Sequence, residues 1–222
     1  MSRWVVIRER DPFSRALEAL RGRLRAGDFV QGEPLPISDL AKALDLSATP
    51  VREALSRLAG EGLIEDRRGR GYFSWRIDPL DLVELYDLNQ LHVGAALGML
   101  EGADASGIRV EQPREALLSD AEAWKADLAK ASERLFATII RLGGGRNLVA
   151  SQATLSDRLG PARRAEPAVL ANTVEELGGL IGLYEARRWR DLAGEVVAYH
   201  QRRRAAAGHI VALIRRQGER VE

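Results

Sequence analysis

Hydroxyl and arginine side chains lie close together in the stretch from residue 47 to residue 57. Ser47 and Thr49 precede Arg52, and Arg57 follows it on the same stretch. A guanidinium group can donate two parallel hydrogen bonds to O6 and N7 of guanine, and hydroxyl groups bind phosphate oxygens. We therefore interpret Arg52 as a candidate for contact with a base edge and Arg57 as a candidate for contact with phosphate.

A second basic cluster follows in the sequence Arg68-Gly69-Arg70-Gly71. Glycine adopts positive φ without strain and lets a backbone approach a sugar-phosphate chain closely. The two arginines would then project charge toward phosphates or into a minor groove. The alternative is that the arginines of both clusters only form a solvated face, as charged residues opposite an apolar stripe usually do.

Three helices are predicted to position the first cluster. Residues 12–26 repeat apolar side chains at the spacing of one helix face, and Gly27 ends the pattern. Ser38 is predicted to cap a short second helix, and Thr49 to cap a third helix with Pro50 at its first position. The inward face of the third helix is predicted to consist of Val51, Ala54, Leu55 and Leu58.

Two short strands, at residues 63–64 and 72–75, are predicted after the third helix, and the glycine-rich turn joins them. Two helices with a short break between them have the proportions of a helix-turn-helix, and the hairpin supplies a wing. In this geometry the N-terminal residues of the second helix of the pair meet base edges in the major groove. We expect contact with DNA from Ser38, Ser47, Thr49, Arg52, Arg57, Arg68, Gly69, Arg70 and Gly71.

Beyond residue 80 the apolar spacing predicts helices and no strand. The expected fold is therefore mainly α, with a winged helix-turn-helix over residues 1–76, a linker at 77–80 and an all-helical bundle over 81–222. Helices are predicted around residues 85–99, 113–142, 146–159, 168–187 and 189–216. Gly143-Gly144-Gly145 predicts a helix end and a turn, because no strand precedes it and no Gly-Lys-Ser/Thr follows it as in a phosphate-binding loop.

Several polar residues of the helical part could line a pocket for a small molecule. The candidates are Asn89, His92, Arg141, Tyr184 and His200. Each could equally be a hydrogen-bonded residue of the bundle interior. His200 continues an apolar stripe of the last helix and should face inward, whereas His209, nine residues later, should face outward.

Charged runs in the helical part are predicted to be solvated. Arg202-Arg203-Arg204 could extend a basic surface, but we expect it to form an exposed face of the last helix. Glu175-Glu176 is likewise expected on a helix surface, with no catalytic role.

Composition narrows the class of protein. The chain has 222 residues and no cysteine, which excludes disulfides, thiolate metal sites and cysteine nucleophiles. Residues 1–76 carry 14 Lys and Arg against 11 Asp and Glu, so the basic part comes first. No apolar run has the length of a signal peptide core or a membrane span, and no nucleophile elbow or dinucleotide fingerprint occurs. We expect a cytoplasmic protein, with no membrane partner, that is not an enzyme.

The residues from Ser47 to Ile64 resemble a known family. They read Ser-x-Thr-Pro-Val-Arg-Glu-Ala-Leu-x-x-Leu-x-x-x-Gly-Leu-Ile, which is similar to the winged-helix signature of GntR-type bacterial transcription regulators. The stretch Gly-x-x-x-x-Gly-x-x-Leu from Gly27 to Leu35 extends the resemblance. Ala48 departs from it, because such proteins often carry arginine there, so the preferred operator should differ.

The helical part resembles the FadR-like effector domain called FCD. In that domain an aspartate and three histidines often bind a divalent metal, which holds a carboxylate effector. Here Glu133 and Ala137 stand at the aspartate and the first histidine, and Glu176 to Leu180 contains no histidine. His200 alone matches a ligand, and one imidazole does not make a tight site. We expect no metal and no cofactor.

Together these observations predict a sequence-specific transcription regulator. One winged helix covers half an operator, so we expect a homodimer on double-stranded DNA, with an effector such as an organic acid in the helical part. Two alternatives remain open: a helical enzyme or ligand-binding module whose winged helix contacts protein, and a DNA binder that responds to no effector.

Overall fold

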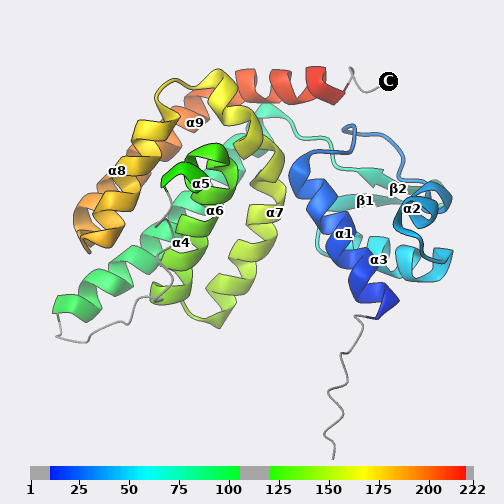
Figure 1. The fold of residues 1–222 in the computed structure, drawn as a ribbon, viewed down its shortest axis with the longest axis horizontal. Helices are drawn as coiled ribbons and strands as arrows, with labels where there is room; N and C mark the ends of the chain where they lie inside the picture. The colour runs from blue at the N-terminus through cyan, green and yellow to red at the C-terminus, as the bar shows by residue number, and fades with distance from the viewer. Residues whose placement is uncertain (1–10, 106–120, 219–222) are drawn as a thin grey trace, which may run out of the picture. The chain divides into compact units, whose positions relative to one another are not determined.

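The computed structural model describes residues 11–105 and 121–218 of the chain (Figure 1). It forms two compact units, Met1–Arg76 and Ile77–Glu222. Within the described residues, the first unit has three helices and a two-stranded sheet, and the second has helices alone. This confirms the predicted fold class.

Helices α1 (Pro12–Ala26), α2 (Ile37–Leu44) and α3 (Ala48–Gly60) enclose the core of the first unit. Its most buried side chains include Leu20, Val51, Leu55 and Leu58. The Asp11 carboxylate accepts a hydrogen bond from the Ser14 amide and so caps α1. Gly27, at φ 74°, ends α1 in the left-handed conformation that glycine adopts without strain.

The starts of α2 and α3 differ from the sequence prediction. Ser38 lies inside α2, where its hydroxyl bonds to Asp39, and Pro36 occupies the capping position. Ser47, rather than Thr49, precedes α3, and its side chain makes no capping hydrogen bond. Both helices begin two residues earlier than predicted, which is within the usual uncertainty of a helix boundary.

Strands β1 (Ile64–Arg67) and β2 (Gly71–Ser74) form an antiparallel hairpin in which Arg67 pairs with Gly71. The segment before α2 extends the sheet, because the Leu35 amide donates to the Tyr72 carbonyl at 2.8 Å. Gly69 and Gly71 have φ of 74° and 89°, so the turn uses two positions that disfavour other residues.

The second unit consists of α4 (Pro79–Ala105), α5 (Ala121–Ala126), α6 (Leu128–Gly143), α7 (Arg146–Val169), α8 (Thr173–Glu185) and α9 (Trp189–Gly218). Helix α4 already includes the last two residues of the predicted linker. The long helices α4, α6, α7 and α9 pack against one another, and α8 covers α6 and α9 (Figure 1). Residues 113–120 of the predicted second segment lie outside the described residues.

Helix α6 ends where it meets α4. Gly143 is its last residue and Gly144 follows in extended backbone, as the glycine run predicts. A Cβ atom on Gly143 would come within 2.1 Å of the Ala96 carbonyl oxygen. The two helix backbones therefore meet at a distance that only glycine allows.

Helix α7 corrects the prediction of two separate helices around residue 160. It runs unbroken through Pro161 and Pro167. A proline inside a helix removes one backbone hydrogen bond. The burial of Leu159, Ala162 and Ala165 on one face of α7 compensates for this loss, and sequence patterns alone do not reveal that compensation.

Candidate nucleic-acid interface and polar core

The N-terminal turn of α3 is free for contact with a ligand. Ser47, Thr49 and Arg52 are exposed there, while Pro50 and Val51 are buried beneath them. Arg52 makes no ion pair or hydrogen bond within the described part of the chain. A helix N-terminus with free amides, hydroxyls and an unpaired guanidinium can bind phosphate and base edges.

Arg57 differs from Arg52 because it is already engaged. Its Nε donates to Glu61 Oε1 at 2.7 Å, and Arg21 Nη2 binds the other oxygen of Glu61 at 2.6 Å. The Arg57 side chain remains 64% exposed, so it can reach phosphate only by giving up or sharing this pair.

The arginines of the hairpin differ in whether they have a partner. Arg67 pairs with Glu65 at 2.8 Å and lies over the Phe73 ring, 4.0 Å from its centre. Arg68 and Arg70 at the tip are exposed and have no partner among the described residues. The turn itself is closed by the Arg70 amide, which donates to the Arg67 carbonyl at 2.7 Å. The tip therefore presents two unpaired positive charges.

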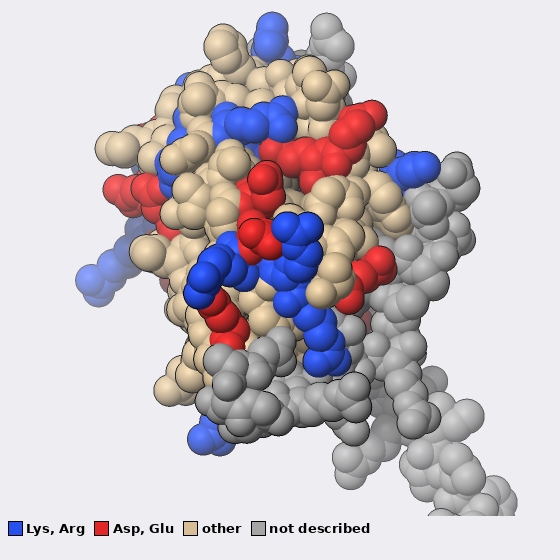
Figure 2. Space-filling model, turned by 90° about the vertical axis from the view of Figure 1, so that its left-hand side faces the viewer, with Lys and Arg blue, Asp and Glu red and all other residues tan. Residues whose placement is uncertain are grey.

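In the structure, all of the predicted DNA-contact residues lie on exposed positions of the first unit. Ser38 is exposed on α2, Ser47, Thr49, Arg52 and Arg57 lie on or next to α3, and Arg68 to Gly71 form the hairpin tip. By contrast, the face of the molecule drawn in Figure 2 intermixes basic and acidic side chains. That face offers no uniform positive surface to a polyanion.

Three of the five predicted pocket residues are bound to one another. His92 Nδ1 lies 3.0 Å from Gln152 Oε1, Gln152 Nε2 donates to Asn89 Oδ1 at 2.8 Å, and Asn89 Nδ2 lies 2.8 Å from His200 Nε2. His200 Nδ1 in turn lies 2.7 Å from the Val196 carbonyl. One assignment satisfies every link: both histidines carry their proton on Nδ1, and each group donates to the next.

Burial keeps His200 neutral. Burial lowers the pKa of His200 from 6.5 to about 3, and the nearby cations Arg203, Arg163 and Arg204 act in the same direction. The hydrogen bond to Val196 opposes the shift only in part. As predicted, His200 is buried and His209 is exposed.

The other two predicted pocket residues do not join this chain. Arg141 is exposed and its Nη2 donates to Thr138 at 3.0 Å. Tyr184 is buried against Trp189, with ring centres 6.0 Å apart, and burial raises its pKa. Asn89, His92 and His200 therefore form one group, and Arg141 and Tyr184 lie apart from it.

A second polar cluster was not predicted. Arg203 Nε donates to Glu166 at 2.8 Å and its Nη1 to Glu176 at 2.9 Å, and its guanidinium lies 3.1 Å from the centre of the Tyr199 ring. Tyr86 donates to the same Glu166 carboxylate at 2.8 Å. Burial raises the pKa of Tyr86 and of Tyr199, the latter to about 12, so both phenols stay protonated.

This cluster corrects the prediction that the arginine run at 202–204 is a solvated face. Arg203 is 2% exposed, Arg202 pairs with Glu176, and Arg204 pairs with Asp87. The prediction was wrong because it considered only the charge of the three arginines and not which face of α9 each of them occupies. Arg203 follows Val196 by seven residues and so lies on the buried stripe of α9.

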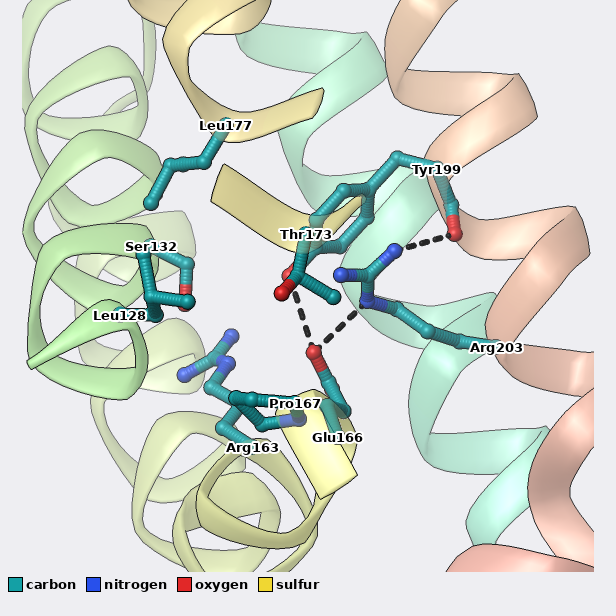
Figure 3. Close-up of a pocket in the computed structure, with 9 residues that line it drawn as sticks. All are labelled: Leu128, Ser132, Arg163, Glu166, Pro167, Thr173, Leu177, Tyr199 and Arg203. Carbon is teal, nitrogen blue, oxygen red and sulfur yellow. Dashed lines mark hydrogen bonds and ion pairs between the residues drawn. The ribbon is translucent and has the colours of Figure 1, made fainter. Parts of the chain in front are cut away.

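The cluster borders a small cavity, shown in Figure 3. The lining residues come from α6, α7, α8 and α9: Leu128, Ser132, Arg163, Glu166, Pro167, Thr173, Leu177, Tyr199 and Arg203. No group of three or more metal-binding side chains occurs in residues 11–105 and 121–218. Leu177 and Leu180, in the segment where the resemblance places a histidine, are buried apolar residues.

The winged helix and the helical second unit define a class, the two-domain DNA-binding transcription regulators. Residues 12–73 match the model of the bacterial regulatory proteins of the gntR family. A relative from Agrobacterium vitis, an HTH-type transcriptional regulator encoded in the TAR-I ttuE-ttuC' intergenic region, is 33% identical over 136 residues, which are 57% of this chain and 78% of the relative. The chain belongs to the GntR family and is a DNA-binding transcription regulator.

Other relatives match over a smaller share of their length. The Nta operon transcriptional regulator of Aminobacter aminovorans is 28% identical, over 61% of this chain and 65% of its own. Two solved structures share the fold: E. coli McbR/YncC (TM-score 0.66, 20% identity) and a GntR transcriptional regulator from Rhodococcus sp. RHA1 (TM-score 0.69, 18% identity). Each comparison covers 88% of this chain and 96% of the other.

Proposed function

We propose that the protein binds a two-fold symmetric operator as a homodimer, with one α3 helix in each major-groove half-site and the hairpin tip on the adjacent backbone or minor groove. The observation that supports this most strongly is the set of unpaired, exposed guanidinium groups of Arg52, Arg68 and Arg70. Ser38, Ser47, Thr49 and Arg57 supply further phosphate contacts, and Gly69 and Gly71 let the tip approach closely.

The homodimer forms through the helical unit. Helix α4 exposes large apolar side chains at several turns: Leu80, Leu88, Leu91 and Met99. Val197 is exposed on the neighbouring helix α9. Contiguous exposed apolar residues are typical of a surface that another subunit covers. A two-fold dimer would place two recognition helices about one turn of DNA apart.

The helical unit is an FCD-like effector domain that takes an organic-acid-like effector, and the protein acts by binding, in the cytoplasm, rather than by catalysis. Asn89, His92 and His200 support the effector site, because their chain of hydrogen bonds touches Arg163 of the neighbouring cavity. Arg141 and Tyr184 would take part only from its periphery. None of the helices in the described ranges has the length and hydropathy needed to cross a bilayer.

Gel shifts on a duplex that the parent protein selects from a random pool would test the DNA contacts. Arg52→Ala should weaken binding by about 1–3 kcal/mol and relax the preference at one base pair, because a bidentate contact to guanine is lost. Arg70→Ala should weaken binding evenly across sequences and lower the salt slope by about 1, because a phosphate contact is lost.

Arg134→Ala is the matched control, since Arg134 is exposed on α6 of the helical unit. It should bind as the parent does. Parental affinity and base preference in both Arg52→Ala and Arg70→Ala at about 0.15 M salt would show that these contacts are assigned wrongly.

A further inference from the structure

Glu53 is an exposed carboxylate on α3 that has no hydrogen bond or ion pair within the described residues. Arg57 follows it by four residues, a spacing at which glutamate and arginine can pair on a helix surface. In the structure, however, Arg57 donates to Glu61 at 2.7 Å, and Arg21 binds the same carboxylate at 2.6 Å. Glu53 therefore presents a negative charge that no described residue neutralises.

The rotation of α3 directs Glu53 outward as strongly as it directs Arg52. The inward face of the helix consists of its buried residues, Pro50, Val51, Ala54, Leu55 and Leu58. Successive residues of a helix are about 100° apart, so the opposite direction passes through Thr49 and Ser56. Arg52 and Glu53 lie about 50° to either side of that direction. An orientation that brings Arg52 to the base edges therefore brings Glu53 to them as well.

Glu53 is also accessible to a large partner. Together with Arg52 and Ser56 it lines an open groove of about 840 Å³ on the first unit, and Phe13 of α1 and Tyr72 of β2 form the far side of that groove. When DNA binds to this surface, the Glu53 carboxylate loses water and needs a hydrogen-bond donor in its place.

DNA offers few such donors. An ionised carboxylate accepts hydrogen bonds and donates none, so phosphate oxygens repel it. In the major groove, guanine N7 and O6 and thymine O4 are acceptors, whereas cytosine N4 and adenine N6 are donors. Adenine carries the acceptor N7 beside its amino group, and cytosine has no acceptor there. Cytosine is therefore the base that fits Glu53 best.

We propose that Glu53 accepts a hydrogen bond from N4 of a cytosine, in a G·C base pair next to the one that Arg52 contacts. The same charge weakens binding to every site that places no amino group there, because it faces acceptor atoms and phosphates instead. Arg52 thus adds affinity, and Glu53 restricts the sequences to which the protein binds. This inference rests on the proposed docking of α3 in the major groove and adds a residue that determines specificity.

Selection of duplexes from a random pool tests the role of Glu53. Glu53→Gln keeps the size of the side chain, and glutamine can bind adenine N6 and N7 together. One G·C pair of the selected site should therefore become an A·T pair. Glu53→Ala should lose the preference at this position, where the parent should discriminate by roughly 5- to 150-fold.

Affinity for a duplex without the selected site gives a second readout. Glu53→Gln and Glu53→Ala should both bind this duplex several-fold more tightly than the parent at the same salt concentration, because a charge that repels phosphate is removed. Glu195→Gln is the matched control, since Glu195 is exposed on α9 of the helical unit and its substitution changes the net charge equally. It should keep the parental specificity and affinity.

The outcomes separate this inference from the proposed function. Parental base preference in both Glu53 variants, or parental affinity for the unselected duplex, would overturn the inference and leave the contacts of Arg52 in place. A change confined to the base pair that Arg52→Ala relaxes would also overturn it, because Glu53 would then act only through Arg52. If the parent selected no duplex at all, the proposed function and this inference would both be wrong.

Discussion

His200 is buried, so the pH dependence of its protonation should affect the stability of the folded protein. Its pKa lies near 3 in the folded protein and near 6.5 in an unfolded chain, because burial disfavours the charged imidazolium. Between these two values the unfolded chain binds a proton that the folded chain does not. The stability contributed by neutral His200 is therefore complete above pH 6.5 and is lost as the pH falls toward 3.

The loss should be measurable by urea unfolding. Between pH 7 and pH 5, protonation of the unfolded chain at His200 should reduce the free energy of unfolding by about 2 kcal/mol. His200→Gln should remove this part of the pH dependence, while its side-chain oxygen still accepts from Asn89. His209 lies on the exposed side of α9, so the His209→Gln variant should lose as much stability between pH 7 and pH 5 as the parent does. If the free energy of unfolding depended on pH equally in the parent and in His200→Gln, His200 would not be a neutral buried imidazole.

At the scale of elements, the crossing of α4 and α6 depends on one missing methyl group. Gly143→Ala should reduce the free energy of unfolding by at least about 2 kcal/mol, because the new Cβ would collide with the Ala96 carbonyl and the backbones must separate. Gly145→Ala is the matched control. Gly145 has φ −81° and open space at its Cβ, but it is the N-cap residue of α7, where alanine is less favourable than glycine, so its change should cost no more than about 1 kcal/mol.

Urea unfolding at pH 7 of both glycine variants would measure these changes. Equal stabilities of Gly143→Ala and Gly145→Ala would mean that the helices can separate at little cost, contrary to the close approach in the structure.

The elements themselves were largely predictable from sequence, because apolar spacing and glycine stops are local signals. Gly27 and Gly143 end helices as expected, and the hairpin turn falls at the predicted glycines. Helix starts and the continuity of α7 were not predictable in the same way. Pro161 lies inside a helix because that helix is packed on one face, and packing is not visible in local sequence.

The polar contacts of the helical unit could also not be predicted from the sequence alone. Arg203 could have been found from its register on the stripe of α9, but its partners Glu166 and Glu176 lie on other helices. Gln152 could not be linked with Asn89 and His200 from spacing, since 63 residues separate it from Asn89. Side-chain pairs that join distant elements need the fold before they can be recognised.

At the scale of the whole molecule, the exposed apolar residues of α4 are the proposed contact surface of the homodimer. Leu91→Glu should convert a dimer into a monomer at micromolar concentration, because a charge would be buried in an apolar interface. Sedimentation equilibrium would report the halved mass, and affinity for a two-fold operator should fall with it. Val149→Glu on α7 is the control that should leave the mass unchanged. A parent that sediments as a monomer, or an unchanged Leu91→Glu dimer, would contradict this assembly.

The two prolines of α7 have a mechanical consequence for the cavity. Pro161 and Pro167 have no amide hydrogen, so the carbonyl groups of Asp157 and Arg163 lack their usual donors one turn ahead. Pro167 also lines the cavity beside Arg163. Because α7 lacks two backbone hydrogen bonds along the stretch that lines this cavity, we expect α7 to bend more easily than α6 or α9.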